Sequence, residues 1–358
     1  MEKRVTLRDI AKIAGVHFTT VGLALRNDSR IKPVTVARVQ AVSRTLGYTR
    51  DAMLSALTAY RHSGTSHFAG VIACITTYDA ATLKTNPTEL RMIEAATTCA
   101  RSQGFALETF QINAPGMTGR LMSRMLRARG IQGVLLSPRT PLPSPMPDME
   151  WEHFSTVAIG YSITRPRVHR VCTHHAYNTR LMMAELRARG YRRIGLILQY
   201  EIFERSLGMV PGAYLAEQYL LPEADRVAPL ITHKVTKASL RQWLREQRVD
   251  CVILSHDAFQ LRAWIDELGY EVPGKLGVCL ATLYGPCEGL AGIDIQLDLI
   301  GETAVRSVVS MLQQNERGLP PYPRYVTVEG RWVDRPSVRP RPSARANAQS
   351  NSLVHQMV

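Results

Sequence analysis

The chain has 358 residues, enough for two or three domains with a sizeable core, and its composition of 45% hydrophobic and 21% charged residues is that of a globular protein. It has neither an N-terminal apolar run of the kind a signal peptide needs nor a stretch approaching about 18 apolar residues, so we expect a cytoplasmic protein without a membrane partner. The formal net charge of +14 favours a polyanionic partner, provided that the charge is localised.

The positive charge is concentrated at the N-terminus. Residues 1–61 contain eleven Lys and Arg against four Asp and Glu, a net charge of +7. Four more arginines lie in the C-terminal 24 residues, a stretch rich in Pro, Ser, Asn and Gln for which we expect disorder from 336 to 358. The six cysteines are scattered singly through apolar stretches without a CxxC pair, which predicts buried thiols in a reducing compartment.

The first sixty residues are dense in helix signals and nearly free of strand signals. Thr6 and Asp9 have the spacing of a capping box, and Gly15 gives the backbone freedom that a tight turn needs. The predicted helices cover 7–14, 18–25 and a stretch that begins at Pro33 and ends before Gly47. This spacing is typical of a helix-turn-helix on a three-helix core.

The second short helix has an outer face suited to the major groove of DNA. The residues expected on that face are His17, Phe18, Thr19, Thr20, Gly22 and Leu23. Hydroxyl groups can bond base edges or phosphates, whereas Phe18 and Leu23 suit contact with thymine methyl groups. A plain helical packing domain is the alternative, and the basic surplus on the same segment favours DNA binding.

A polar stretch, 60–68, reads as a linker, after which strand and helix patterns alternate. Apolar runs such as "FAGVIACIT" and "DCVILS" predict buried strands, and stretches such as "IGETAVRSVVSMLQQN" predict covering helices. This alternation predicts parallel sheets covered on both faces. About ten such units exceed what one open sheet normally holds, so we expect two lobes.

The N-terminal segment resembles the DNA-binding headpiece of the lactose-repressor/galactose-repressor family. The resemblance rests on "VTLRDIAKIAGVHFTTVGLALRNDSRI", "VQAVSRTLGY" and "AMLSALTAYR", which keep the family's order of "A-G-V", "T-V", "LGY" and a short hinge helix. It implies an α/β chain with a headpiece over 1–50, a hinge helix and linker over 51–67, and a periplasmic-binding-protein-like core of two lobes over 68–335. Fragments such as "GIQGVLLSP" and "RGYRRIGLI" extend the resemblance over most of 68–333, and it implies three crossovers between the lobes.

The resemblance also implies DNA-contacting residues. Phe18, Thr19 and Leu23 match positions that read bases, and Arg30 and Tyr48 match positions that contact phosphates. Leu57 matches the hinge leucine that wedges into the minor groove. With Thr6, Thr20 and Asn27 these residues make up the expected DNA-binding set. Gly22 and His17 depart from the usual serines, which leaves the half-site sequence open.

In the effector cleft the family pattern is weaker. The family's Asn-Asp loop reads His256-Asp257 here, and its Phe-Asp position reads Ala281-Thr282, so a sugar- or purine-binding carboxylate is missing. Candidate cleft residues are Tyr78, Arg205, His256 and Thr282. A conventional hexose effector is therefore not expected, and whether the chain has any small-molecule effector stays open.

No catalytic, cofactor or metal site is expected. "CTHH" at 172–175 lacks the further ligands that a zinc site needs, and Walker A, GxSxG and GxGxxG elements are absent. The predicted function is that of a transcriptional regulator, expected to be a repressor, which binds a near-palindromic operator as a homodimer in the nucleoid. The alternatives are a cytosolic sugar-binding protein with a vestigial headpiece and a nucleoid protein without sequence preference.

Overall fold

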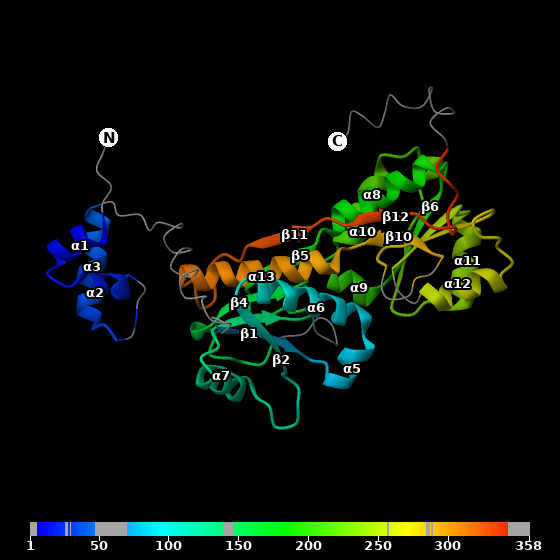
Figure 1. Ribbon diagram of the computed structural model, residues 1–358. Coiled ribbons are helices and arrows are strands. Elements are labelled where there is room, and N and C mark those ends of the chain that lie inside the picture. The colour runs from blue at the N-terminus through cyan, green and yellow to red at the C-terminus, as the bar shows by residue number, and fades with distance from the viewer. Residues whose placement is uncertain are drawn as a thin grey trace. The chain divides into compact units, whose positions relative to one another are not determined.

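The structure is a computed structural model and describes residues 6–25, 28, 30–46, 70–138, 146–255, 258–283, 287 and 289–342 (Figure 1). The chain divides into two compact units, residues 1–67 and residues 68–358. None of the described helices combines the length and the apolar character needed to cross a membrane.

The N-terminal unit contains the three expected helices. They are α1 (Leu7–Ala14), α2 (Phe18–Ala24) and α3 (Pro33–Thr45). All three contribute to one small core, in which Ile10, Val21, Ala24 and Val39 have no exposed surface. The helix-turn-helix expected from the sequence is therefore confirmed.

Both sequence signals at the ends of α1 act as expected. Thr6 is the N-cap, and a full capping box joins its side chain and backbone to Asp9, with the Thr6 amide donating to Asp9 Oδ2 over 2.8 Å. Gly15 ends the helix with φ +63° and ψ +39°, the left-handed region that glycine enters without strain. The chain can thus turn sharply and set α2 against α1.

The larger unit contains two six-stranded, mostly parallel sheets. The first has the order β11-β5-β4-β3-β1-β2 and the second the order β12-β10-β9-β8-β6-β7. The first sheet's strands are β1 (Gly70–Thr76), β2 (Phe105–Gln111), β3 (Gly133–Leu136), β4 (Ser155–Ile159), β5 (His169–Thr173) and β11 (Tyr325–Val328). Those of the second are β6 (Ile194–Gln199), β7 (Leu230–Thr232), β8 (Cys251–Leu254), β9 (Gly277–Leu280), β10 (Ala291–Asp294) and β12 (Arg331–Val333).

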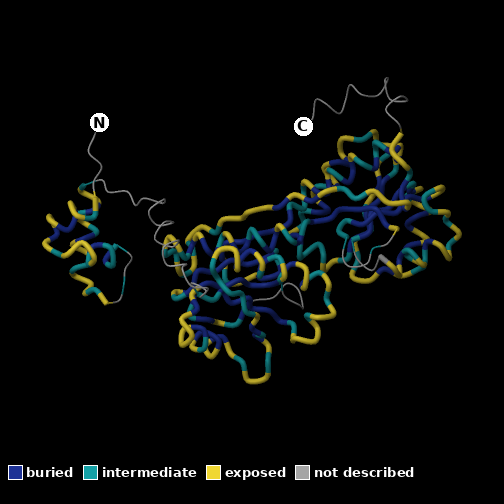
Figure 2. Tube along the Cα trace, in the orientation of Figure 1, coloured by how far each residue is buried: buried dark blue, intermediate teal, exposed yellow. Residues whose placement is uncertain are grey.

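Helices cover both faces of each sheet, and the central strands β3, β4, β8 and β9 are buried between them (Figure 2). The helices of this unit are α5 (Ala80–Thr85), α6 (Pro87–Ser102), α7 (Gly119–Ala128), α8 (His175–Ala188), α9 (Tyr200–Arg205), α10 (Met209–Tyr219), α11 (Lys237–Gln247), α12 (Ala258–Glu267) and α13 (Leu297–Gln314). Two short 3₁₀ turns lie at Trp151–His153 and Glu223–Asp225. α13 packs along α6 and over the first sheet, and one hydrophobic cluster continues from there into the second lobe.

The chain passes between the two lobes three times. The passages follow β5, β10 and β11, because α8, α13 and β12 lie in the lobe opposite to the strand before them. The two-lobed α/β fold with three crossovers is thus confirmed. Strands β5 and β7, the short strands β10 to β12 and helices α5, α9 and α10 were not among the expected elements.

The end of the core lies beyond the boundary expected at 335. Ser337 is 2% exposed and bridges the second sheet, where its Oγ donates to the carbonyl of Val278 (2.6 Å) and accepts from the amide of Ala291 (2.8 Å). Val338 is buried beside it. Ser337 and Val338 are therefore packed against the second sheet, in the stretch for which disorder was expected, and 343–358 lie outside the described residues.

Candidate functional site

The outer face of α2 is exposed, as the sequence predicts. Phe18 is 43% exposed and Thr19 is exposed, whereas Thr20 and Leu23 are half-buried beside the inward-facing Val21. His17 precedes the helix, and its Nδ1 lies 2.9 Å from Thr19 Oγ1. The His17 ring also lies 4.4 Å from that of Phe18, centroid to centroid. This face combines a hydroxyl group, an imidazole and an apolar ring, the set of groups that can read base edges.

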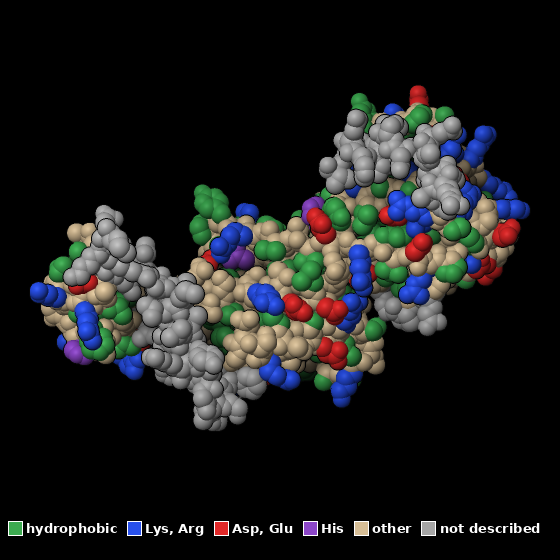
Figure 3. Space-filling model, turned by 45° about the horizontal axis from the view of Figure 1, so that its top comes forward, with side chains coloured by type: hydrophobic (Ala, Val, Ile, Leu, Met, Phe, Trp, Pro, Cys, Tyr) green, Lys and Arg blue, Asp and Glu red, His purple; other side chains and the backbone are tan. Residues whose placement is uncertain are grey.

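The other expected DNA-contacting residues have mixed surroundings. The Thr6 side chain is exposed and engaged in the α1 cap. Arg30 is 73% exposed and makes an ion pair with Asp28, with Nη2 to Oδ2 at 2.7 Å. Lys and Arg side chains are visible on this unit in Figure 3. Asn27, Tyr48 and Leu57 lie outside the described residues.

The larger unit holds two adjoining cavities that share His175 and Arg205. The first cavity, of about 50 Å³, lies within the second lobe and is lined by α8, α9, α10 and the ends of β8 and β9. The second cavity, of about 70 Å³, is lined by residues of both lobes, among them Glu89 and Tyr161. Together they form a cleft at the carboxyl ends of parallel strands, where ligands bind in open α/β sheets.

Two of the four expected cleft residues line this site. Arg205, at the end of α9, lines both cavities, and Thr282 lines the first. Tyr78 lines neither cavity; its amide donates to Thr76 Oγ1. His256 lies outside the described residues. Residues that the sequence analysis did not single out for the cleft are Glu89, His175, Asn178 and Ser255.

The "CTHH" segment supplies a helix cap and a cleft residue. His174 is the N-cap of α8, and its Nδ1 accepts a hydrogen bond from the Tyr177 amide (3.2 Å). Burial lowers the pKa of His175 to about 4, assisted by the nearby charges of Arg205 and His174, so its imidazole is neutral at pH 7. Among the described residues, no group of three or more His, Cys, Asp or Glu side chains could hold a metal ion.

Glu89 is a carboxyl group buried in the wall of the second cavity. It lies in the first turn of α6, is 5% exposed, and its Oε2 accepts a hydrogen bond from Ser137 Oγ (2.8 Å). Burial raises the pKa of Glu89, and the Ser137 hydrogen bond and the charge of Arg205 only partly oppose this. A buried carboxyl of this kind destabilises the protein when it ionises.

The glutamine variant Glu89→Gln is expected to stabilise the larger unit at neutral pH. A carboxyl whose pKa is higher in the folded state contributes stability below its unfolded pKa, and this contribution is lost as the pH rises through the folded value. Glutamine keeps an acceptor for Ser137 and cannot ionise. Thermal unfolding from pH 4 to 8 should show a gain for the variant that disappears toward pH 4; a gain that is equal at all pH values would contradict the assignment.

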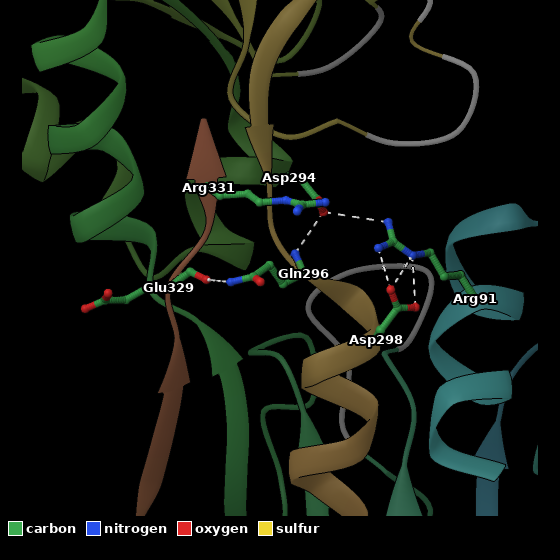
Figure 4. A network of polar contacts seen from close by, with 6 residues as sticks. All are labelled: Arg91, Asp294, Gln296, Asp298, Glu329 and Arg331. Atoms are coloured by element: carbon green, nitrogen blue, oxygen red, sulfur yellow. Dashed lines mark hydrogen bonds and ion pairs between the residues drawn. The ribbon is translucent and has the colours of Figure 1, made fainter. Parts of the chain in front are cut away.

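A polar network ties the lobes together beside the cleft (Figure 4). Asp294, at the end of β10, pairs with Arg331 of β12 (2.9 Å) and with Arg91 of α6 (3.6 Å). Arg91 also binds Asp298, in the first turn of α13, with Nη2 to Oδ2 at 2.5 Å. Gln296, with φ +56°, donates from its amide to Asp294 Oδ1 and from its side chain to the carbonyl of Glu329. Two of the three crossovers therefore meet in one network.

The chain thus combines a helix-turn-helix unit with a two-lobed core that contains a cleft. Residues 6–51 match the family model described as bacterial regulatory proteins, lacI family. This match lies within the N-terminal unit of the chain.

The chain is also similar to a curated protein in its N-terminal unit and to solved structures over most of its length. The chain is 46% identical over 48 residues to the maltose regulon regulatory protein MalI of Vibrio furnissii; the match covers 13% of this chain and 35% of that protein, so it spans about a third of the relative's length. The structure of a transcriptional regulator CelR–cellobiose complex is similar with a TM-score of 0.51 and 20% sequence identity. The similarity covers 93% of this chain and 100% of that chain. The structure of the lac repressor dimer bound to operator and the anti-inducer ONPF is similar over 94% of this chain and 100% of that chain, with 18% sequence identity and a TM-score of 0.51. Both of these structures have the same fold as the present chain.

Proposed function

We propose that the chain is a sequence-specific transcriptional regulator, a repressor that binds a near-palindromic operator as a homodimer and responds to a small molecule. The observation that carries the proposal is the exposed face of α2, held by the buried Val21 and Ala24 in a unit that matches the lacI-family model. The basic surplus of residues 1–61 supplies the attraction to phosphates.

The proposed contacts on DNA follow from exposure and residue type. Phe18, Thr19 and Leu23 would contact base edges, with Thr20 beside them and Arg30 on the phosphate backbone. Thr6 and Asn27 complete the proposed set in this unit. For Tyr48 and Leu57 the support is the sequence resemblance, with Leu57 as a wedge in the central minor groove. The MalI and lac repressor relatives act in regulation or bind operator DNA, as their names state.

The cleft is the proposed effector site. Its second cavity is lined by residues of both lobes, so a bound molecule can favour one arrangement of the lobes. A preference of about 3 kcal/mol would change operator occupancy by roughly two orders of magnitude. The absence of a nucleophile elbow or phosphate-binding loop in the sequence favours regulation over catalysis.

Selection of genomic fragments by the purified chain tests the function. We expect enrichment of a near-palindromic site, and binding that falls with salt by a slope of about −0.9 per neutralised phosphate. Thr19→Ala should change the preference at one base of each half-site by about 1–3 kcal/mol, because Thr19 is exposed on α2.

Arg30→Ala is the matched control in the same unit. It should weaken binding to all sequences alike and reduce the salt slope by about 1 per monomer. Affinity for the selected site no higher than for a scrambled duplex, at modest ionic strength, would overturn the proposed function. Equal effects of Thr19→Ala on every sequence would overturn only its role in base recognition.

A further inference from the structure

We infer that the cleft binds a small anion, a molecule whose carboxylate or phosphate group lies in the first cavity against Arg205, Asn178 and Ser255. This inference deepens the proposed function, because it names the chemical class of the effector. It rests on hydrogen-bond donors without partners and on the charge of the cavity wall.

Asn178 presents a buried donor to the first cavity. It is 4% exposed in the first turns of α8, and its Oδ1 accepts a hydrogen bond from the Gly330 amide over 2.7 Å. The amide of Gly330 needs an acceptor, which assigns Oδ1 and Nδ2 of the Asn178 side chain. Nδ2 is buried and has no hydrogen-bond partner among the described residues. A buried donor of this kind costs about 1–3 kcal/mol unless a ligand or water satisfies it.

Two more donors line the same cavity. Ser255, directly after β8, has a buried Oγ without a partner in the described part of the chain. Arg205 is half-buried at the end of α9, and no ion pair or hydrogen bond joins it to a described residue. A guanidinium in a partly closed cavity pairs preferentially with a carboxylate or phosphate, which it can bind through two parallel hydrogen bonds.

The rest of the first cavity has no negative charge that would repel an anion or pair with Arg205 in its place. None of its lining residues is acidic, and Thr282 stands in the wall at the position where the family pattern has a carboxylate. His175 is neutral and can donate or accept without adding charge. Met182, Ile202 and Val210 close the cavity with apolar surface, which lowers the local dielectric and strengthens the pairing with Arg205.

The second cavity suits the uncharged part of the same molecule. It is continuous with the first through His175 and Arg205, and it offers hydroxyl groups on Thr88, Thr173 and Tyr161. Glu89 lines this cavity together with Arg205, and its carboxyl group can accept a hydrogen bond from a ligand hydroxyl. The pattern fits a hydroxylated acid or a phosphorylated polyol, held by its charged end in the second lobe.

Binding to the full chain without DNA tests the inference with matched ligands. Glucose, gluconate and glucose 6-phosphate, and galactose, galacturonate and galactose 1-phosphate, are added at millimolar concentration and followed by thermal shift and calorimetry. We expect at least one acid or phosphate to bind about tenfold or more tightly than its neutral counterpart. The acid and phosphate arms distinguish the two kinds of anion. Equal binding of the neutral sugars, or binding of no anion, would overturn the inference.

Variants assign the binding to the first cavity. Arg205→Gln should weaken the anion about 10- to 100-fold, and Arg205→Lys should restore part of the affinity because it keeps the charge. Asn178→Asp keeps the acceptor for Gly330 and places a negative charge beside the anion, so it should also abolish binding. Arg241→Gln, at an exposed arginine of α11, is the matched control and should leave binding unchanged. Loss of affinity in Arg241→Gln equal to that in Arg205→Gln would overturn the assignment.

Operator binding separates the two proposals. If the anion binds and no operator is selected, the proposed function fails while the inference on the cleft stands. If an operator is selected and no anion binds, the inference fails alone. The unfolding temperature of each variant without ligand shows whether the fold is retained.

Discussion

Replacing Gly301 by alanine is expected to destabilise the larger unit by about 1–3 kcal/mol. Gly301 lies in α13 where this helix crosses α6, and a Cβ atom there would lie 2.4 Å from the carbonyl oxygen of Met92 and 3.2 Å from the amide nitrogen of Ala96. Both are backbone atoms of α6, so a side-chain rotation cannot relieve the overlap and the helices must separate. Urea unfolding followed by tryptophan fluorescence measures the loss, because all four tryptophans lie in this unit.

Gly212→Ala is the matched control for this substitution. Gly212 is an exposed position in α10, and an added Cβ would have no neighbour within 4 Å. Alanine there should raise stability by about 0.5–1 kcal/mol, because it restricts the unfolded chain and favours the helix. If Gly301→Ala were as stable as Gly212→Ala, the close contact between α6 and α13 would not be what holds the first lobe together.

Gly15→Val is expected to weaken binding to the selected operator by about tenfold or more. A β-branched residue at φ +63° costs about 1–3 kcal/mol, a large part of the roughly 2–7 kcal/mol available to a unit of this size. The turn holds α2 against α1, so its loss removes the DNA-binding surface. Fluorescence anisotropy with the operator measures the effect, and the tryptophan-monitored unfolding of the larger unit should stay unchanged.

Gly15→Asn distinguishes a backbone effect from a side-chain effect. Asparagine enters the left-handed region more readily than valine, so this variant should keep most of the affinity. No neighbouring atom lies within 4 Å of an added Cβ at this position. Steric overlap therefore cannot explain a loss of operator affinity that occurs in the valine variant and not in the asparagine variant. Equal losses in both variants would contradict the turn-based account.

The helix-turn-helix could be predicted nearly to the residue because its signals are local. Thr6, Gly15 and Pro33 mark helix ends, and the apolar periodicity marks the buried faces. By contrast, α10 contains Pro211 and Gly212, which read as a break although the helix continues through them. The short strands β10 and β12 have three or four residues each and no alternation long enough to recognise.

The cleft was harder to predict because its residues come from distant parts of the chain. Arg205 and Thr282 were found through the resemblance, whereas Asn178 and Ser255 become significant only when the fold places their unsatisfied atoms at one cavity. In the sequence, His175 belongs to the "CTHH" segment that was weighed as a metal site. Only the fold shows that it lines both cavities as a buried, neutral imidazole. Ser337 likewise lies in a polar, Pro-rich stretch, and only the second sheet shows why it is buried.

Asp294 gives the core a mechanical property. Arg331 belongs to the same sheet as Asp294 and travels with it, whereas Arg91 belongs to the opposite lobe. Any swing of one lobe against the other must therefore stretch or shorten the contact of Asp294 with Arg91 while that with Arg331 stays constant. The carboxylate of Asp294 therefore holds Arg91 of the opposite lobe from a fixed position in its own sheet. Raising the ionic strength should weaken this contact between the lobes by screening the two charges, so that the lobes move more freely.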